Sequence, residues 1–220
     1  MSQKTIDAAV GFADETLHPA AFDLEAAHKI ASHVAGRDDS RPHIVGVRHE
    51  PGLAIATDGH RMITVPSGYS GEPYTATVDN YLEHTENQTF VEWQRVLPEN
   101  LSGGILLDVV LLRKVIKHTK ALMKGSWGPR AKISREEKAV VLETWPLRDP
   151  AAHKPVKFRI GDAACECFGT ESVGLNLRYL EEALRSAKGL VKFETGKSLA
   201  PVSVLHTTGI RHIIMPMRIS

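Results

Sequence analysis

The sequence predicts an α+β fold in which helices are followed by groups of short antiparallel strands. Segments with apolar residues at helical spacing alternate with short strand-like segments. Tight-turn dipeptides such as Asp58-Gly59 separate neighbouring strands, as they do in β-hairpins. This pattern occurs more than once along the 220 residues, which indicates an internal repeat. We expect two domains, residues 1–100 and 101–220.

The first domain begins with a predicted helix over residues 19–35. Pro19 suits the first turn of a helix, apolar residues recur at helical spacing, and Gly36 suits the position after a helix end. Turns at Glu50-Pro51-Gly52 and Asp58-Gly59 then separate three predicted strands. These strands cover residues 43–48, 53–57 and 61–65.

The rest of the first domain has weaker periodicity. Residues 66–92 are rich in Pro, Gly, Ser and Tyr, and only residues 74–78 have the character of a strand. No convincing second helix precedes Trp93. We therefore expect either an abbreviated first domain or a second helix that is reduced to a turn near residues 80–84.

The second domain has two strong helix signals. Residues 108–124 have an amphipathic pattern, and residues 176–188 begin at Asn176, a good N-cap, and precede Gly189, a good helix terminator. Strands are predicted between and after these helices. They lie at residues 131–134, 139–144, 156–170 with a turn at 161–162, 191–194, 202–206 and 210–217.

The composition is that of an ordinary globular protein, with 42% hydrophobic and 24% charged residues. No apolar run reaches the length of a membrane-spanning helix, and residues 1–5 lack the features of a signal peptide, so a cytoplasmic protein is expected. Cys165 and Cys167 lie two apart on one predicted strand. That spacing favours reduced packing residues over a disulfide or a zinc site, and no cofactor or metal is expected.

A cationic stripe is predicted on the helix at residues 108–124. The net charge of +1 gives no global argument for nucleic acid, so any DNA contact must come from a local patch. At about 100° per residue, four cations fall within an arc of roughly 60° opposite the apolar face. They are Arg113, Lys117, Lys120 and Lys124. Such a row can follow a phosphate backbone, although an ordinary solvated face is the competing interpretation.

The helix at residues 176–188 is a weaker candidate for DNA contact. Arg178 and Arg185 share one of its faces, but Glu182 lies between them. Glu181 can also pair with Arg185 four positions later.

Two segments far apart in the sequence have the character of a binding surface. One is the tight turn at Asp58-Gly59 with the strand that leaves it. The other is the C-terminal Met-Pro-Met segment, where the proline indicates a sheet edge and the thioethers adapt to several partners. We predict a peptide-binding groove formed by Thr57, Gly59, His60, Arg61, Met62, Ile213, Ile214, Met215, Pro216, Met217 and Arg218. Two ordinary core strands are the competing interpretation.

Four segments, in order along the chain, resemble the bacterial DNA polymerase III beta subunit, the sliding clamp family. They are ATDGHRM at 56–62, WQRVLPEN at 93–100, LNLRYL at 175–180 and HIIMPMRI at 212–219. The resemblance implies the DNA-clamp fold, with domains similar to the family's central and C-terminal domains, and no catalytic activity. It also implies that Pro98, Asn176 and Tyr179 line the peptide groove.

The resemblance further implies a function in DNA replication. A sliding clamp is a processivity factor that encircles double-stranded DNA without sequence preference. It receives DNA polymerase and the clamp loader through short peptide motifs. Family members close six domains into a ring, so two domains per chain imply a homotrimer.

Two other functions stay open. A clamp-derived accessory protein or decoy could bind clamp-binding peptides without encircling DNA. A small metal-dependent hydrolase could use Asp58 and His60 with other histidines. The eleven histidines are scattered, however, and form no recognisable metal-binding motif.

Overall fold

The computed structural model describes residues 21–85, 89–97, 105–122, 130–136, 139–144, 156–162, 172–195 and 200–218. Its helices are α2 (Leu24–Ser32), α3 (Val109–Leu122) and α4 (Leu177–Ala183), with 3-10 turns η1 (Pro42–Ile44) and η2 (Trp93–Val96). Its strands are β1 (Val47–Glu50), β2 (Leu53–Thr57), β3 (Arg61–Pro66), β4 (Tyr74–Ala76), β5 (Ile105–Asp108), β6 (Arg130–Glu136), β7 (Ala139–Thr144), β8 (Val156–Asp162), β9 (Ser172–Asn176), β10 (Leu190–Thr195), β11 (Val202–His206) and β12 (Arg211–Ile214).

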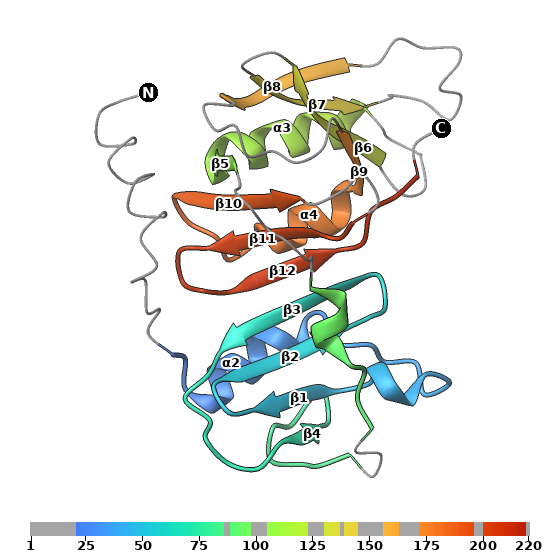
Figure 1. The fold of residues 1–220 in the computed structure, drawn as a ribbon, viewed down its shortest axis with the longest axis vertical. Coiled ribbons are helices and arrows are strands. Elements are labelled where there is room, and N and C mark those ends of the chain that lie inside the picture. Colours follow the sequence, from blue (N-terminus) through green and yellow to red (C-terminus); the bar gives the residue numbers. More distant parts are fainter. Residues whose placement is uncertain are drawn as a thin grey trace.

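These strands form two antiparallel sheets, which confirms the predicted α+β class. The larger sheet has eight strands in the order β4-β1-β2-β3-β12-β11-β10-β5, and the smaller has four in the order β8-β7-β6-β9. β3 pairs with β12 near the C-terminal end of the sequence, with Met62 opposite Ile213. A continuous sheet therefore crosses the predicted domain boundary (Figure 1).

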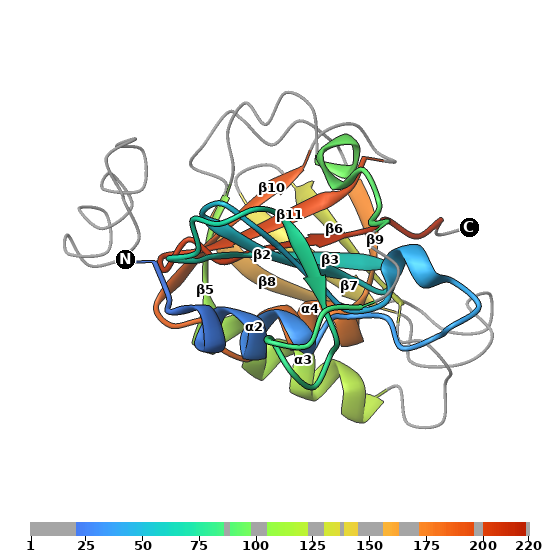
Figure 2. The same cartoon turned by 90° about the horizontal axis from the view of Figure 1, so that it is seen from below.

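Antiparallel strands follow each described helix: β1 to β4 follow α2, β6 to β8 follow α3, and β10 to β12 follow α4. We call these the α2 unit (residues 21–85), the α3 unit (residues 105–162) and the α4 unit (residues 172–218). All three helices lie on the same side of the molecule, as the view from below shows (Figure 2). This side is called the helical face below.

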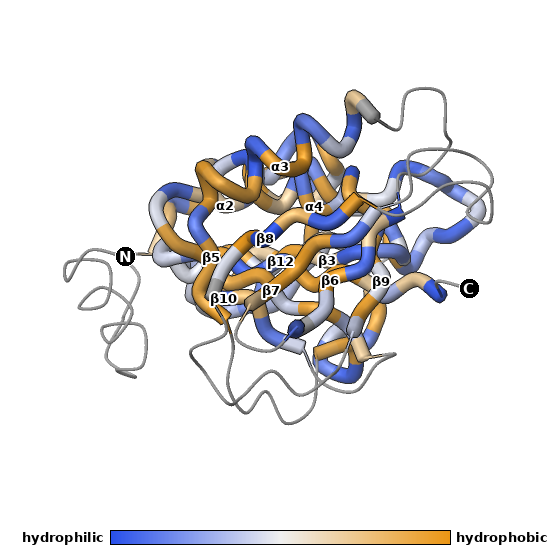
Figure 3. The backbone as a smooth tube through the Cα atoms, turned by 90° about the horizontal axis from the view of Figure 1, so that it is seen from above, coloured by the Kyte–Doolittle hydropathy of each residue, from blue (hydrophilic) through white to orange (hydrophobic). Residues whose placement is uncertain are grey.

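Hydrophobic side chains separate the helices from the sheets. α2 packs through Ala27 and Ala31, both fully buried, against strands β1 to β3. A larger core lies between α3, α4 and the strands of their units. The strands are largely hydrophobic, whereas α3 alternates between hydrophilic and hydrophobic residues along its length (Figure 3). On the sheet face opposite α2, Ile55, Met62 and Ile213 form a small third core, which Trp93 and its neighbours cover.

Several predicted boundaries are wrong. The strand expected at 43–48 begins with η1, where Pro42 starts a 3-10 turn, and pairing starts only at Val47. β5 and β9 are strands that the sequence pattern did not reveal. The helix expected at 176–188 ends at Ala183. Gly36 does not terminate α2 in a left-handed conformation; instead its N–H donates to the carbonyl of Thr57 at 2.8 Å.

The α2 unit has no second helix between β4 and η2 in the part that the structure describes. Residues 81 and 82 form a turn, and His84 makes a bridge to Ala76. A turn near residues 80–84, one of the two predicted alternatives, is therefore what the structure has. Cys165 and Cys167 lie outside the described residues.

Candidate functional site

The turn between β2 and β3 is fixed by its own side chains. Gly59 adopts a φ of +87°, a conformation that favours glycine. Asp58 Oδ1 accepts hydrogen bonds from the amides of His60 and Arg61 at 2.9 and 3.0 Å. Thr57 Oγ1 donates to the carbonyl of Arg61 at 2.7 Å and accepts from the amide of Gly59 at 3.1 Å. These hydrogen bonds hold the 57–61 turn in one shape.

The C-terminal segment lies directly beside this turn. β12 pairs with β3, and the chain then continues so that the amide of Met215 donates to the carbonyl of His60 at 3.0 Å. The side chain of Met215 is 39% exposed, whereas Met62 is only 2% exposed. The two segments predicted to form one surface are thus neighbours in space.

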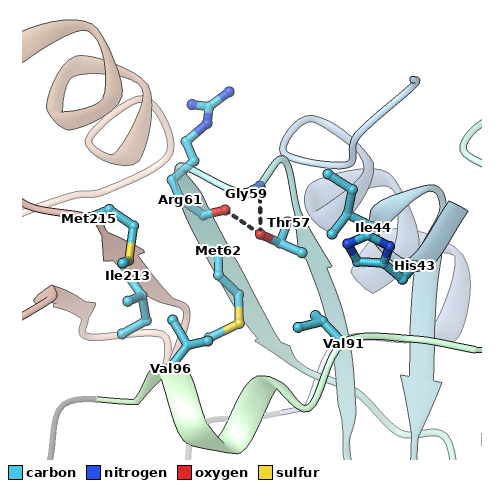
Figure 4. Close-up of a pocket in the computed structure, with 10 residues that line it drawn as sticks. All are labelled: His43, Ile44, Thr57, Gly59, Arg61, Met62, Val91, Val96, Ile213 and Met215. Carbon is cyan, nitrogen blue, oxygen red and sulfur yellow. Dashed lines mark hydrogen bonds between the residues drawn. The ribbon is translucent and has the colours of Figure 1, made fainter. Parts of the chain in front are cut away.

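A mostly apolar pocket of about 220 Å³ lies where these segments meet (Figure 4). Six predicted groove residues line it. They are Thr57, Gly59, Arg61, Met62, Ile213 and Met215. Four further lining residues were not predicted: His43, Ile44, Val91 and Val96. Val96 lies in the WQRVLPEN segment, so that resemblance was a usable signal for it, whereas His43 and Ile44 lie in η1 and Val91 lies in an irregular segment.

The remaining predicted groove residues lie elsewhere. Ile214 points to the opposite side of β12 and is buried in the core beneath α4, so its assignment to the groove is corrected. His60 stacks on Tyr179 with ring centroids 6.3 Å apart, and neither lines the pocket. Asn176 caps α4 by accepting from the amide of Arg178 at 2.9 Å.

Four predicted groove residues remain. Pro216, Met217 and Arg218 follow Met215, and Pro98 follows η2 in the sequence. Pro216 and Met217 are half-buried and Arg218 is exposed, and none of the three lines the pocket. The amide of Met217 donates to the carbonyl of Gly174 at 2.8 Å, which ties this segment to β9. Pro98 lies outside the described residues.

Arg61 connects the 57–61 turn to α4. Its Nε pairs with Asp58 Oδ2 at 3.0 Å, its Nη1 pairs with Glu182, and its guanidinium carbon lies 4.9 Å from the centre of the Tyr179 ring. Burial raises the pKa of Glu182, but hydrogen bonds from Arg178 and Arg61 outweigh burial and hold that pKa below its ordinary value. Glu182 is therefore ionised at neutral pH.

The predicted cationic stripe is only partly free. Arg113 Nη2 donates to carbonyl oxygens at the end of α4, with distances of 2.8 Å to Arg185 and 3.0 Å to Ala187. Lys120 pairs with Glu181 of α4 at 2.6 Å, which replaces the pairing expected between Glu181 and Arg185. Packing of α4 against α3 therefore brings acids and carbonyls to the stripe, which the sequence of α3 alone could not reveal.

The other cations of the helical face are exposed. Lys117 and Arg185 are exposed and make no ion pair within the described residues, while Arg178 pairs with Glu182 at 3.0 Å. Lys124 lies outside the described residues. A set of cations from α3 and α4 is thus available to a polyanion, but it is smaller than predicted.

The described part of the chain contains no cluster of side chains suited to bind a metal ion. No group of three His, Cys, Asp or Glu side chains there could hold a metal ion. Asp58, the acid considered for hydrolysis, already accepts three hydrogen bonds within its own turn. Within the same residues, no helix is long and apolar enough to cross a membrane.

No protein-family profile and no curated protein sequence matches the chain. Its structure is nevertheless similar to bacterial sliding clamps. The Caulobacter crescentus beta sliding clamp superposes with a TM-score of 0.72 at 17% identity, over 92% of this chain and 65% of that chain. The Bartonella birtlesii sliding clamp, bound to griselimycin, gives 0.71 at 14% identity, over 89% and 64%. The Thermotoga maritima DNA polymerase III beta subunit gives 0.68 at 16% identity, over 90% and 65%.

The chain therefore has the clamp-like fold, as the four resembling segments implied. It spans 64 to 65% of the length of these clamps.

Proposed function

We propose that this chain is a subunit of a DNA sliding clamp, a non-catalytic processivity factor of DNA replication. In this role the helical face surrounds duplex DNA without reading its sequence. DNA polymerase and the clamp loader bind through short peptide segments in the pocket. The clamp-like fold and the construction of the pocket support this function.

The observation that carries the proposal is that two segments far apart along the described chain build one apolar pocket. Met62 and Thr57 come from the α2 unit, and Ile213 and Met215 come from the α4 unit. An apolar side chain entering the pocket gains about 25 cal/mol per Å² of surface removed from water. Because the Thr57 hydroxyl is already paired, the pocket favours leucine or phenylalanine. A short flexible peptide loses freedom on binding, so its affinity is modest.

The charge of the helical face supports contact with DNA. Lys117 and Arg185 are exposed and Arg178 projects from α4, so phosphates can approach all three. Contacts to phosphate position a protein without selecting a sequence. The proposed assembly is a homotrimer, in which three copies of two clamp-like domains make six.

Peptide binding is the first test. A peptide with a glutamine and a downstream leucine and phenylalanine is titrated by calorimetry. Met215→Ala is expected to weaken binding about tenfold, equivalent to about 1.4 kcal/mol, because it removes a pocket wall. The matched control is Met217→Ala in the same segment, which does not line the pocket and leaves affinity unchanged. Equal affinities of wild type and Met215→Ala would contradict the assignment.

The second test measures the affinity for duplex DNA and the mass of the assembly in solution. Lys117→Glu is expected to weaken binding to unrelated duplex sequences by the same factor, with a smaller salt dependence. Light scattering is expected to give the mass of three copies. A single-copy mass at micromolar concentration contradicts the ring.

The engaged cations favour one alternative, an accessory protein that binds clamp-binding peptides without encircling DNA. Arg113 and Lys120 are held by α4, and Asp23 and Glu25 lie at the start of α2. Peptide binding by a monomer that fails to bind duplex DNA would identify this alternative.

A further inference from the structure

One residue of the pocket also contacts the helical face. Arg61 lines the pocket, and Figure 4 shows its guanidinium extending away from the other lining side chains. That guanidinium reaches α4 and pairs with Glu182. The pocket and α4 are therefore joined by a direct contact between side chains.

Glu182 is shared between two arginines that differ in their access to solvent. Its Oε2 pairs with Arg61, whose side chain is 12% exposed. Its Oε1 accepts from Nε of Arg178 at 3.0 Å, and the side chain of Arg178 is 73% exposed. Arg178 can therefore turn to a phosphate in solution, whereas Arg61 stays enclosed between Asp58, Glu182 and Tyr179.

We propose that Glu182 couples the two surfaces, so that duplex DNA bound at Arg178 strengthens the hold of Glu182 on Arg61 and raises the affinity of the pocket for peptide. Glu182 and Arg61 are positioning residues in this scheme, because they act on the peptide through the 57–61 turn. The inference rests on the proposed function, which supplies the DNA and the peptide.

The direction of the coupling follows from how one carboxylate serves two cations. While Arg178 and Arg61 share Glu182, each neutralises part of its charge. A phosphate that takes Arg178 leaves Glu182 to Arg61 alone. Because that second pair is largely shielded from water, its attraction is screened less than that of a surface pair.

A more firmly held Arg61 acts on the pocket wall through contacts already present. Its Nε pairs with Asp58, which holds the turn that contains Gly59. The carbonyl of His60 in the same turn accepts from the amide of Met215. Fixing the turn before the peptide arrives reduces the freedom that must be lost on binding, and so increases affinity.

The expected effect is about fivefold, at the lower end of typical coupling between sites. Linkage also requires that saturating peptide raise the affinity for DNA by the same factor. This reciprocity gives the scheme an internal check.

The experiment titrates a fluorescent Gln-Leu-Phe peptide into the full chain, without duplex DNA and with duplex DNA at saturation. The wild type should bind peptide about fivefold more tightly with DNA. Arg178→Ala should bind tightly already without DNA and gain nothing from it, because Glu182 then serves Arg61 alone. Glu182→Gln should bind weakly in both conditions.

Arg185→Ala is the matched control. Arg185 is exposed just after α4 and has no ion-pair partner among the described residues. Its removal should weaken DNA binding, yet the peptide response should persist once DNA is saturating. A response lost in Arg185→Ala as well would mean that general charge, and not Glu182, links the surfaces.

The outcomes separate the inference from the proposed function. Wild-type protein that binds both ligands, with one peptide affinity throughout, overturns the coupling alone. The same holds if Arg178→Ala responds to DNA as the wild type does. Protein that binds no duplex DNA, or no peptide, contradicts the proposed function and the coupling together. Arg178→Ala changes an exposed side chain, so the test stands even if Glu182→Gln fails to fold.

Discussion

The α2 and α4 units are built alike, yet different groups pack against the side of each helix. We call this side the flank of the helix, and we say that the groups packed against it close the unit. In both, an Asp or Asn side chain caps the helix and a group of antiparallel strands follows. The flank of α4 is covered by α3. Arg113 donates to carbonyls at the end of α4, and Lys120 pairs with Glu181. The α4 unit is thus closed by a second helix and its cations.

The flank of α2 is covered by imidazole and phenol rings instead. His28 of α2 shares a 3.0 Å hydrogen bond with His49 of β1, and its other ring nitrogen lies 3.2 Å from the carbonyl of Val78. Tyr74 stacks between His49 and His84, at centroid distances of 4.9 and 4.3 Å. Residues 77–85 therefore lie beside α2 and contact His28.

This difference shows that a helix-and-strands unit does not require a second helix beside it. A few stacked rings cover the same flank with a short segment. The exchange also changes the charge of the helical face. α3 carries Arg113, Lys114, Lys117 and Lys120 with no acid, whereas residues 77–85 carry Asp79 and Glu83 with no Lys or Arg.

Acidification should have the largest effect, because both units contain buried imidazoles. Burial lowers the pKa of His28, and lowers the pKa of His49 to about 4. Burial likewise lowers the pKa of His206 to about 4 and of His212 to about 3 in the α4 unit. The unfolded chain binds these protons near pH 6.5, where the folded chain does not. Stability is therefore complete above about pH 6.5 and is lost progressively toward about pH 4.

Urea unfolding at several pH values between 7.5 and 4.5 measures this loss. His49→Phe removes one imidazole from the α2 unit while keeping a ring against Tyr74, so its stability should fall less steeply with acid. A free energy of unfolding that stays constant over this range would mean that the imidazoles bind protons in the folded protein as readily as in the unfolded chain.

A smaller effect is expected from opening the flank of α4. Arg113→Ala removes the donor that Arg185 and Ala187 carbonyls share, at a cost of about 1 to 2 kcal/mol in the free energy of unfolding. Lys117→Ala on the same helix is the matched control, because Lys117 is exposed and makes no ion pair within the described residues, so its removal should change the free energy of unfolding by no more than about 0.5 kcal/mol. Chemical denaturation of both variants measures the difference, and equal stabilities would show that Arg113 does not close the unit.

The sequence predicted the bounds of three strands correctly. The bounds of β2, β7 and β11 match the predicted ranges. β5 and β9 were not predicted, because the strands they pair with, β10 and β6, lie far from them along the chain. Local periodicity reports the burial of a segment and not the partner that provides it.

The candidate site was predictable to a similar extent. The two walls formed by continuous segments were identified, since their residue types and the resemblance agreed. His43 was missed because it lies in η1, where a strand was predicted, and Val91 because it lies in an irregular segment; the Val91 amide donates to the His43 carbonyl. The engagement of Arg113 depends on carbonyls more than 70 residues away, beyond the reach of any pattern on α3.

The smallest expected effect tests whether the α2 flank opens on its own. The Tyr74 hydroxyl donates to the carbonyl of Tyr81 at 3.0 Å, which ties β4 to the 77–85 segment. Tyr74→Phe keeps the stacked ring but loses this bond, at a cost of about 1 kcal/mol. Exchange of the Thr77 and Thr85 amides, which bond to Glu83 and Thr75, should accelerate about fivefold. Amides of β10 to β12 should keep their rates, because their unit is closed by α3. The control is Tyr69→Phe, whose hydroxyl bonds to the carbonyl of Glu72 outside this segment. Equal acceleration in both units would mean that the rings of the α2 unit open only with the whole molecule, so that the two closures, although built from different groups, act as one.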